Sequence, residues 1–356
     1  MRIQLALGEQ DSRYMNTLIA FLEKNYMEQV EVKAFSTPEL LKEYLKGNTA
    51  DIVLLDEAFG MKPEEVPGEA KVGWLVDDSE KTDIDGVRAV GKFRKPELIY
   101  KDILALYAER GKGSSGYMKN SSSNCQLLMF VGFSGGTGAS TMAAAAAKYL
   151  AMAGETVLYL NLETTGNSAN FFRGEGNYSF EEVIYALKSQ KVNVSLKMES
   201  TVRRDASGVY FFTPCRMAIS MLEMTDDDVM QVLSILKNTS NYTKVVIDMG
   251  FGFSDRYIQA MEYVDRIIVV NDGTDIANSK VIRTIKLLEI MEEQRQIRIL
   301  DHMGMIYNKF SSSKSSNELP GGMLPVIGVF PPVKHALVNE IIQIMLTKTE
   351  LFEKLR

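Results

Sequence analysis

The sequence predicts an α/β protein of two domains, each with a mostly parallel sheet covered by helices on both faces. A length of 356 residues favours two domains over one. Short apolar runs alternate with amphipathic stretches, which is typical of parallel strands joined by helices. Residues 110–124 (RGKGSSGYMKNSSSN) are rich in Gly, Ser and Lys and separate two such series. We therefore expect domains at 1–109 and 126–356, with a flexible linker at 110–125.

The first domain is expected to contain five strands that alternate with helices. Asp11–Glu23 has apolar residues at helical spacing, and Thr37-Pro38-Glu39 has the residues that begin a helix. Prolines and glycines interrupt the connection 57–70, and the connection 78–86 is short, so full helices are not expected there. The expected strands are Ile3–Leu7, Val30–Phe35, Asp51–Asp56, Val72–Asp77 and Val87–Phe93.

The second domain is expected to be a larger, doubly wound α/β domain with seven strands. Ser179-x-x-Glu182 and Thr225-x-x-Asp228 resemble patterns that cap the N-terminus of a helix. The apolar segment Val338–Leu346 is expected to dock on this domain rather than bind a membrane. The expected strands are Leu127–Gly132, Thr156–Leu162, Val209–Thr213, Lys244–Asp248, Arg266–Asn271, His302–Tyr307 and Val326–Phe330.

The composition is that of a water-soluble protein of the reducing cytoplasm. Apolar residues make up 46% and charged residues 24% of the chain. The net charge of −6 disfavours broad nucleic-acid binding. Cys125 and Cys215 form neither a metal-ligand pattern nor a disulfide framework. No secretory signal is visible, and no apolar run reaches the roughly 20 residues that span a bilayer.

A glycine-rich loop, SGGTGAST (134–141), lies between the expected strand LLMFVGF and an expected alanine-rich helix. Strand, glycine loop and helix together form a context in which backbone N–H groups and a helix N-terminus bind phosphate. The candidate phosphate-binding residues are Gly135, Gly136, Thr137, Gly138, Ala139, Ser140 and Thr141. An ordinary glycine turn in an α/β domain is the alternative.

The loop resembles the deviant Walker A motif, K-G-G-x-G-K-[ST], of the MinD/ParA family of P-loop ATPases. Gly135, Gly136, Gly138 and Ser140 match the motif, but Ser134 and Ala139 stand where the family has its two lysines. In the family, the first lysine reaches across an ATP-bridged dimer. The resemblance implies ATP and Mg²⁺ as ligands, with Ser140 on the metal, and a homodimer across ATP.

Other segments between Gln126 and Arg356 resemble further motifs of the family, in the family's order. TVLYLNLE (156–163) implies Asn161 near the metal and Glu163 as the residue that orients the attacking water. KVVIDMG (244–250) resembles Walker B and implies Asp248 near magnesium. IYNKF (306–310) implies Asn308 at the base. VIGVFPPVKHAL (326–337) implies Pro331 and Pro332 beside adenine. The alternative is that the polar residues named above are ordinary turn residues at strand ends, namely Asn161, Glu163, Asp248 and Asn308.

The missing lysines affect catalysis more than binding. Backbone amides and a helix end remain to bind phosphate, whereas hydrolysis depends on cations that stabilise the transferring phosphoryl group. We therefore expect ATP to be held as a structural ligand and hydrolysed slowly or not at all. A cation from elsewhere in the sequence could restore hydrolysis, and the candidates are Arg203, Arg204, Arg256 and Lys280.

The first domain resembles a response-regulator receiver, which has a flavodoxin-like fold. DIVLLDEAFG (51–60) places Asp56 at the phospho-acceptor position, and VGKFRKP (90–96) implies Lys95 as its cation. The metal-binding acidic pair after the first strand is replaced by Leu7 and Gly8, and Asp77 adds negative charge where Ser or Thr is usual. These departures favour an atypical receiver that makes contacts, with phosphorylation of Asp56 as the alternative.

The pairing of a degenerate receiver with a MinD/ParA-like domain resembles the TadZ/CpaE family. The resemblance implies a cytoplasmic, ATP-dependent dimer at the cell pole or the inner face of the membrane. It would help assemble a Tad (Flp) pilus secretion system, with partner proteins bound through the receiver-like domain. Sequence-specific nucleic-acid binding is not implied, and membrane association would be indirect. The alternatives are an active ATPase switch in partitioning or polar positioning, nonspecific DNA binding, and regulation through phosphorylation.

Overall fold

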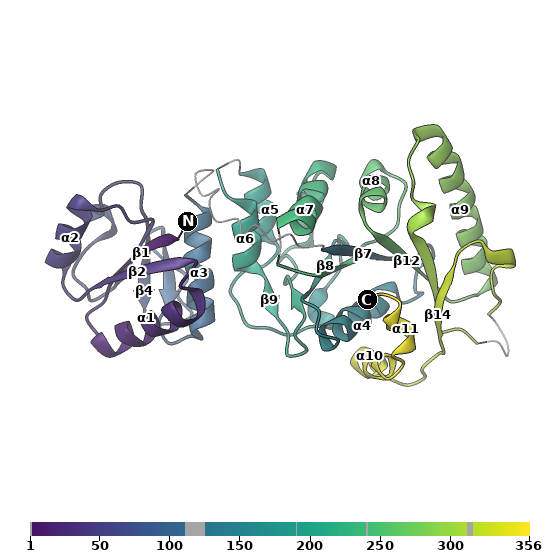
Figure 1. Cartoon of the computed structure of the whole chain (residues 1–356), viewed down its shortest axis with the longest axis horizontal. Helices are drawn as coiled ribbons and strands as arrows, with labels where there is room; N and C mark the ends of the chain where they lie inside the picture. Colours follow the sequence, from purple (N-terminus) through teal and green to yellow (C-terminus); the bar gives the residue numbers. More distant parts are fainter. Residues whose placement is uncertain (1, 111–124, 190, 240, 312–315) are drawn as a thin grey trace. The chain divides into compact units, whose positions relative to one another are not determined.

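The computed structural model describes residues 2–110, 125–189, 191–239, 241–311 and 316–356, and these form two compact units (Figure 1). Unit 1 comprises the described residues within 1–119 and 185–201. Unit 2 comprises those within 120–184 and 202–356. Residues 111–124, which make up most of the expected linker, lie outside the described residues.

Unit 1 is built on a sheet whose five parallel strands have the order β2-β1-β3-β4-β6. This order is the flavodoxin-like arrangement expected from the sequence. A short strand, β5 (Asp83–Ile84), pairs antiparallel with β6. The parallel strands are β1 (Ile3–Gly8), β2 (Val30–Phe35), β3 (Ile52–Asp56), β4 (Lys71–Val76) and β6 (Val87–Gly91).

Helices cover both faces of this sheet. α1 (Ser12–Tyr26) and α3 (Pro96–Ala108) contribute to the apolar core on one face, and α2 (Pro38–Gly47) contributes to the core on the other. The connection after β3 contains only a 3-10 turn, η1 (Pro63–Glu65), and the connection after β4 contains β5. The expectation that these two connections lack full helices is confirmed.

Helix α3 has buried residues around its whole circumference, so it needs cover on more than one side. α6 (Val194–Thr201) provides part of that cover, because it packs on α3 and adds Leu196 to the core. Lys197 of α6 is buried and pairs with Glu109 at 3.0 Å. The described residues within 185–201, which the sequence prediction assigned to the second domain, therefore pack in unit 1.

Unit 2 is built on an eight-stranded sheet in the order β14-β13-β12-β7-β11-β8-β10-β9. All its neighbouring strands pair in parallel except β9, which runs antiparallel to β10. The mostly parallel, doubly wound sheet expected from the sequence is confirmed. The strands are β7 (Gln126–Val131), β8 (Val157–Asn161), β9 (Arg203–Arg204), β10 (Tyr210–Phe211), β11 (Lys244–Asp248), β12 (Arg266–Asn271), β13 (Met303–Asn308) and β14 (Val326–Phe330).

Two groups of helices lie on opposite faces of this sheet in Figure 1. One group is α4 (Ala139–Met152), α10 (Val338–Leu346) and α11 (Glu350–Glu353), and the other is α7 (Asp226–Thr239), α8 (Asp255–Tyr263) and α9 (Asp275–Arg295). α5 (Glu181–Lys188) precedes α6 in the chain. The cap predicted for α7 is present, because Thr225 N donates to Asp228 Oδ2 at 2.7 Å and Asp228 N donates to Thr225 Oγ1 at 3.2 Å.

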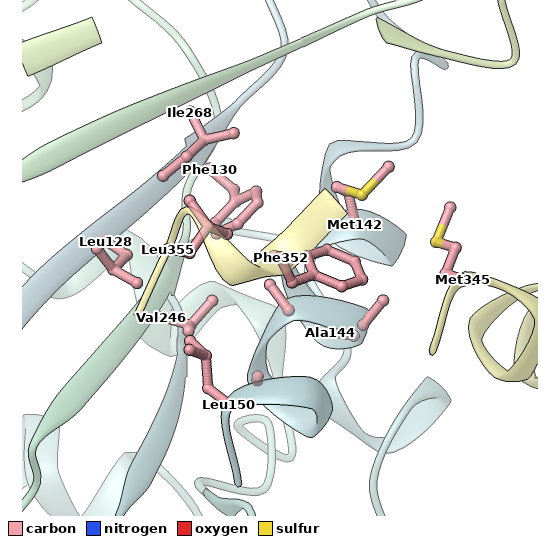
Figure 2. Close-up of a cluster of buried hydrophobic side chains, with 14 of the residues drawn as sticks. Leu128, Phe130, Met142, Ala144, Leu150, Val246, Ile268, Met345, Phe352 and Leu355 are labelled. Carbon is pink, nitrogen blue, oxygen red and sulfur yellow. The ribbon is translucent and has the colours of Figure 1, made fainter. Parts of the chain in front are cut away.

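The core between α4 and the sheet is completed by the last residues of the chain. Ala143–Ala147 are fully buried, and their small side chains allow α4 to pack closely against the strands. α10 packs on α4 as expected, with Met345 buried. Figure 2 shows Phe352 and Leu355 within this cluster, with Phe352 near Ala144 and Leu355 near Phe130. None of the helices in the described part of the chain is long and apolar enough to cross a membrane.

Candidate functional site

The candidate site lies at the carboxyl edge of the unit 2 sheet. β7 occupies the middle of the sheet between β11 and β12, and it leads into the loop 134–141. Asp248 ends β11, Asn161 ends β8 and Asn308 ends β13. Ligands of open α/β sheets bind at this edge. The parallel topology therefore brings the ends of these strands to the edge at which the loop lies.

The glycine loop has an open apex and a tightly packed base. Gly136 and Gly138 have φ angles of +77° and +88°, which non-glycine residues rarely adopt. A Cβ at Gly138 would lie 2.5 Å from Asn308 Nδ2, whereas one at Gly135 or Gly136 would meet no described atom within 4 Å. α4 begins at Ala139, so the unpaired N–H groups of its first turn lie at the loop. Ser134 and Ala139, at the positions of the family lysines, leave the loop without a cationic side chain of its own.

Asp248 is the centre of a buried hydrogen-bond cluster. Tyr159 Oη donates to Asp248 Oδ2 at 2.5 Å, and Asn161 Nδ2 donates to the same oxygen at 2.9 Å. Ser140, from the glycine loop, also hydrogen-bonds to Asp248. Burial raises the pKa of Asp248 to about 6, with a further contribution from Glu163, while these three hydrogen bonds act in the opposite direction. The structure thus joins the predicted metal-side residues Ser140, Asp248 and Asn161.

Tyr159 is a member of this cluster that the sequence analysis missed. Tyr159 belongs to β8, and its fully buried ring contacts the rings of Phe171 and Phe172. In the sequence it is an apolar strand residue, so its pattern indicates core packing alone. Only the pairing of β8 with β11 reveals that its hydroxyl reaches Asp248.

Asn161 and Glu163 lie next to each other beyond the end of β8. Asn161 Oδ1 accepts from Glu163 N at 3.1 Å, so both polar ends of the Asn161 side chain have partners within the protein. Glu163 is half-buried and borders a pocket of about 240 Å³ that Phe180, Phe212 and Arg216 also line. The predicted water-orienting role of Glu163 stays a prediction, as does the contact of Asn161 with a metal.

Asn308 joins β13 to the glycine loop. Its Nδ2 donates to Thr137 O at 2.7 Å, and its Oδ1 is buried without a hydrogen-bond partner among the described residues. A buried acceptor without a donor is costly, so this oxygen is suited to an amino group of a ligand. Pro331 and Pro332 are exposed and follow β14, whose last residue Phe330 pairs with Asn308. The three residues predicted to contact a base therefore lie on neighbouring strand ends.

The residues present fit a magnesium nucleotide. Within the described residues, no group of three or more His, Cys, Asp or Glu side chains could hold a metal ion. Mg²⁺ bound with a nucleotide needs few protein ligands, because phosphate oxygens and water complete its shell. The Ser140 hydroxyl beside the Asp248 carboxylate matches this requirement, and the open loop apex at Gly135 and Gly136 leaves space for phosphate.

Unit 1 contains a second polar cluster, around Asp56 at the end of β3. Lys92 is buried, forms an ion pair with Asp56, and lies 2.8 Å from Glu9 Oε2 and 3.6 Å from Asp77 Oδ1. Burial disfavours its charged form, but hydrogen bonds and attraction from Asp56 and Glu9 outweigh this and raise the pKa of Lys92. Burial and the three nearby carboxylates raise the pKa of the Tyr14 hydroxyl well above its usual value.

The lysine that pairs with Asp56 is Lys92, three residues before the Lys95 chosen from the sequence. The reason is that β6 ends at Gly91, two residues earlier than the expected end at Phe93. Lys92 is therefore the first residue after the strand, while Lys95 is exposed at the N-cap of α3. The expected partner of Asp56 is corrected to Lys92, and phosphorylation of Asp56 stays a prediction.

Comparison with known proteins agrees with this architecture. Residues 1–108 match the family model of the TadZ-like receiver domain. Residues 128–341 match the model of the CobQ/CobB/MinD/ParA nucleotide binding domain. No curated protein matches the chain.

The fold is similar to that of a solved ParA family ATPase, and a MinD structure also matches at a lower score. A ParA family ATPase from Chlorobium tepidum is 16% identical with a TM-score of 0.54, over 66% of this chain and 99% of that one. MinD from Pyrococcus horikoshii, complexed with Mg-ADP, is 18% identical with a TM-score of 0.49, over 65% of this chain and 96% of that one. The chain therefore belongs to the CobQ/CobB/MinD/ParA nucleotide-binding family, and together with its TadZ-like receiver domain it has the architecture of TadZ/CpaE-type proteins.

Proposed function

We propose that unit 2 binds ATP with Mg²⁺ at the loop 134–141, keeps it as a structural ligand, and hydrolyses it slowly or not at all. The observation that carries this proposal is a glycine loop with an open apex that has Ser134 and Ala139 in place of two lysines. The loop retains the groups that bind phosphate and lacks the cations that stabilise phosphoryl transfer.

Each proposed contact uses a group with suitable chemistry. The backbone N–H groups from Gly135 to Thr141 would bind phosphate oxygens, and the Ser140 hydroxyl would bind Mg²⁺. Asp248 would hold the metal through water, supported by Tyr159 and Asn161. Asn308 Oδ1 would accept from the amino group of adenine, with Pro331 and Pro332 beside the ring.

The low rate follows from how phosphoryl transfer is catalysed. P-loop enzymes accelerate it mainly by placing positive charge where negative charge develops, and one such arginine contributes on the order of 10³ to 10⁵ in rate. The proposed site has neutral residues at both lysine positions, Ser134 and Ala139. Bound Mg²⁺ would supply charge at the phosphates and aid binding, but it would not replace both missing side chains.

We further propose that the chain dimerises across ATP and acts as a localisation and assembly factor for a Tad (Flp) pilus secretion system. This proposal rests on the combination of a TadZ-like receiver with a MinD/ParA domain. Unit 1 would bind other assembly proteins and recruit them to the cell pole, without a role for sequence-specific nucleic acid. Any association with the membrane would occur through these partners.

A second candidate is an active ATPase switch in partitioning or polar positioning. It is favoured by the two carboxylates that the site retains, Asp248 and Glu163, which lie close enough for Glu163 to raise the pKa of Asp248. Steady-state turnover separates the two functions, because a switch must hydrolyse ATP to return to its starting state.

Calorimetry and light scattering test the proposal directly. The wild-type chain is titrated with Mg·ATP, and its mass is measured by size-exclusion light scattering with and without the nucleotide. We expect saturable binding and a dimeric mass with Mg·ATP. No uptake at millimolar nucleotide would refute the proposal, whereas binding without a change in mass would refute only the dimer.

Gly135→Ala provides a matched variant for this titration. A Cβ at position 135 meets no described atom within 4 Å, so the variant should keep the thermal stability of the nucleotide-free protein. If the loop closes on phosphate as proposed, the added methyl group blocks close approach of the backbone and weakens ATP binding. Unchanged affinity in this variant would place the nucleotide elsewhere.

A further inference from the structure

A lysine from outside the glycine loop lies on it. Lys309 Nζ donates a hydrogen bond to Gly136 O at 2.8 Å, across a sequence separation of 173 residues. Its side chain also approaches Gly138, where an added Cβ would lie 3.8 Å from Lys309 Cε. The loop that has lost the two lysines of its motif therefore has an ammonium group at its apex, supplied by the residue that follows β13.

The backbone at Lys309 is anchored beside the loop, while its side chain is exposed. Asn308 Nδ2 donates to Thr137 O at 2.7 Å, which ties the end of β13 to the loop one residue before the lysine. Lys309 has a φ angle of +59°, in the left-handed region that residues with a Cβ seldom adopt. Phe310 N then donates to Phe330 O at 3.1 Å. A lysine in such a conformation persists where its surroundings fix it, and these two flanking hydrogen bonds do so.

The charge of Lys309 is available to a ligand. The residue is exposed, and no carboxylate of the described residues lies within ion-pair distance of it. Two of the cations proposed from the sequence are engaged elsewhere. Arg203 donates to Gly174 O and Tyr178 O, and Arg256 pairs with Asp226. A backbone carbonyl is a weaker partner for an ammonium group than a phosphate oxygen, because the phosphate group is ionised.

We propose that Lys309 supplies the cation that the glycine loop lacks, by exchanging its contact with Gly136 O for the phosphate groups of a bound nucleotide. This inference rests on the proposed binding of ATP at the loop. In other P-loop proteins the lysine within the loop reaches the β- and γ-phosphates. Here the same chemical group comes from the end of a neighbouring strand.

The position of Lys309 also explains how the chain can combine binding with slow turnover. An exposed lysine on a flexible stem adds attraction for a polyanion wherever its phosphates lie within reach. Catalysis requires more, because the charge must be fixed in advance where it develops in the transition state. Lys309 can attract phosphate and so favour binding. Its exposed side chain is not fixed in advance, so it does not meet the requirement for catalysis.

The test is a calorimetric comparison of the full chain and its variants, each titrated with Mg·ATP and with AMP. Lys309→Ala should weaken ATP binding on the order of tenfold, the usual effect of losing one charge-assisted contact, and should weaken AMP binding much less. Lys309→Arg should restore most of the ATP affinity. Lys286→Ala removes an exposed lysine from α9 and should match the wild type.

Three outcomes would overturn the inference, and they are distinguishable. If Lys309→Ala binds ATP as tightly as the wild type, Lys309 does not contact phosphate, although the proposed function stands. If the variant loses affinity for ATP and for AMP by the same factor, the lysine affects only the shape of the loop. If the wild type binds no ATP at all, the proposed function fails and this inference fails with it. Thermal unfolding of each variant without nucleotide shows whether it is folded.

Discussion

The carboxyl group of Asp248 is deeply buried. The stability of the nucleotide-free protein should therefore depend on the protonation of this one group. Its side chain is 1% exposed, and its pKa is raised from 3.8 to about 6. The folded protein therefore binds this proton more tightly than the unfolded chain does. The contribution of Asp248 to stability is largest below pH 3.8 and is lost as the pH rises to about 6.

Asp248→Asn should remove this pH-dependent loss. Without nucleotide and metal, we expect the variant to be more stable than the wild type at neutral pH. Its advantage should grow by about 1 kcal/mol between pH 5 and pH 7, as the raised pKa requires. Urea unfolding at the two pH values measures this difference, and contributions from other carboxylates cancel between the two proteins. If the stability advantage of Asp248→Asn over the wild type shrinks as the pH rises, the pKa of Asp248 is not raised.

The Asp56 cluster provides a second prediction about single residues. Asp56 and Glu9 share one buried ammonium group, that of Lys92, and Asp77 lies nearby. A phosphoryl group on Asp56 would add negative charge where the available cation is already shared. We therefore expect acetyl phosphate with Mg²⁺ to leave no stable label on the chain. Stable label that disappears in Asp56→Asn, but persists in a control such as Asp51→Asn, would contradict this expectation.

The residues of both sites were predictable to different degrees. The apolar pattern of a buried strand indicates where the strand ends, and the resemblance to the family's motifs singled out Asp248 and Asn308 at two such ends. The partners of these residues could not be predicted. Lys92 rather than Lys95 pairs with Asp56 because of a difference of two residues at the end of β6. Tyr159 has an apolar pattern and shows its polar role only through the neighbouring strand.

Among the helices, α10 and α11 show how the end of the chain stabilises the site. The glycine loop depends on α4, and α4 is held between the sheet and these two helices. Phe352 is fully buried next to α4, as Figure 2 shows, and stacks at an angle on Tyr149 with ring centroids 5.5 Å apart. This packing links the C-terminal residues to the position of the loop.

Phe352→Ala should destabilise unit 2 by about 3 to 5 kcal/mol, because it leaves a cavity in a closely packed core. Leu337→Ala is the matched control. Leu337 is 74% exposed, so its loss should change stability by no more than about 0.5 kcal/mol. Urea denaturation of both variants measures the effect. Equal stability of the two variants would mean that the chain end does not pack on α4.

The secondary structure was more predictable than its assignment to units. The alternation of strands and helices predicted both sheets, because the period of apolar residues differs between the two elements. The missing helices in unit 1 were predicted from prolines and short connections. The packing of α6 in unit 1 was not predicted. No local sequence pattern indicates that a helix between α5 and β9 packs on α3. That packing depends on the apolar circumference of α3.

For the whole molecule, the central question is whether a glycine loop without lysines can bind a nucleotide, as we propose. The sequence showed the loss at Ser134 and Ala139, and the four cations it offered did not include Lys309. Lys309 reaches the loop through the parallel order of β13, β12 and β7 and through a left-handed turn after β13. Contacts across this sequence separation depend on the folded sheet, so local sequence patterns do not reveal them.

The most direct test of the account is the fate of bound ATP. The purified chain is loaded with Mg·ATP, freed from excess nucleotide and incubated, and the retained nucleotide is then identified by chromatography. We predict that ATP is recovered largely intact and that steady-state release of phosphate barely exceeds that of buffer. Rapid, sustained release of phosphate that is abolished in Asp248→Ala would contradict the central claim that this loop binds ATP without efficiently cleaving it.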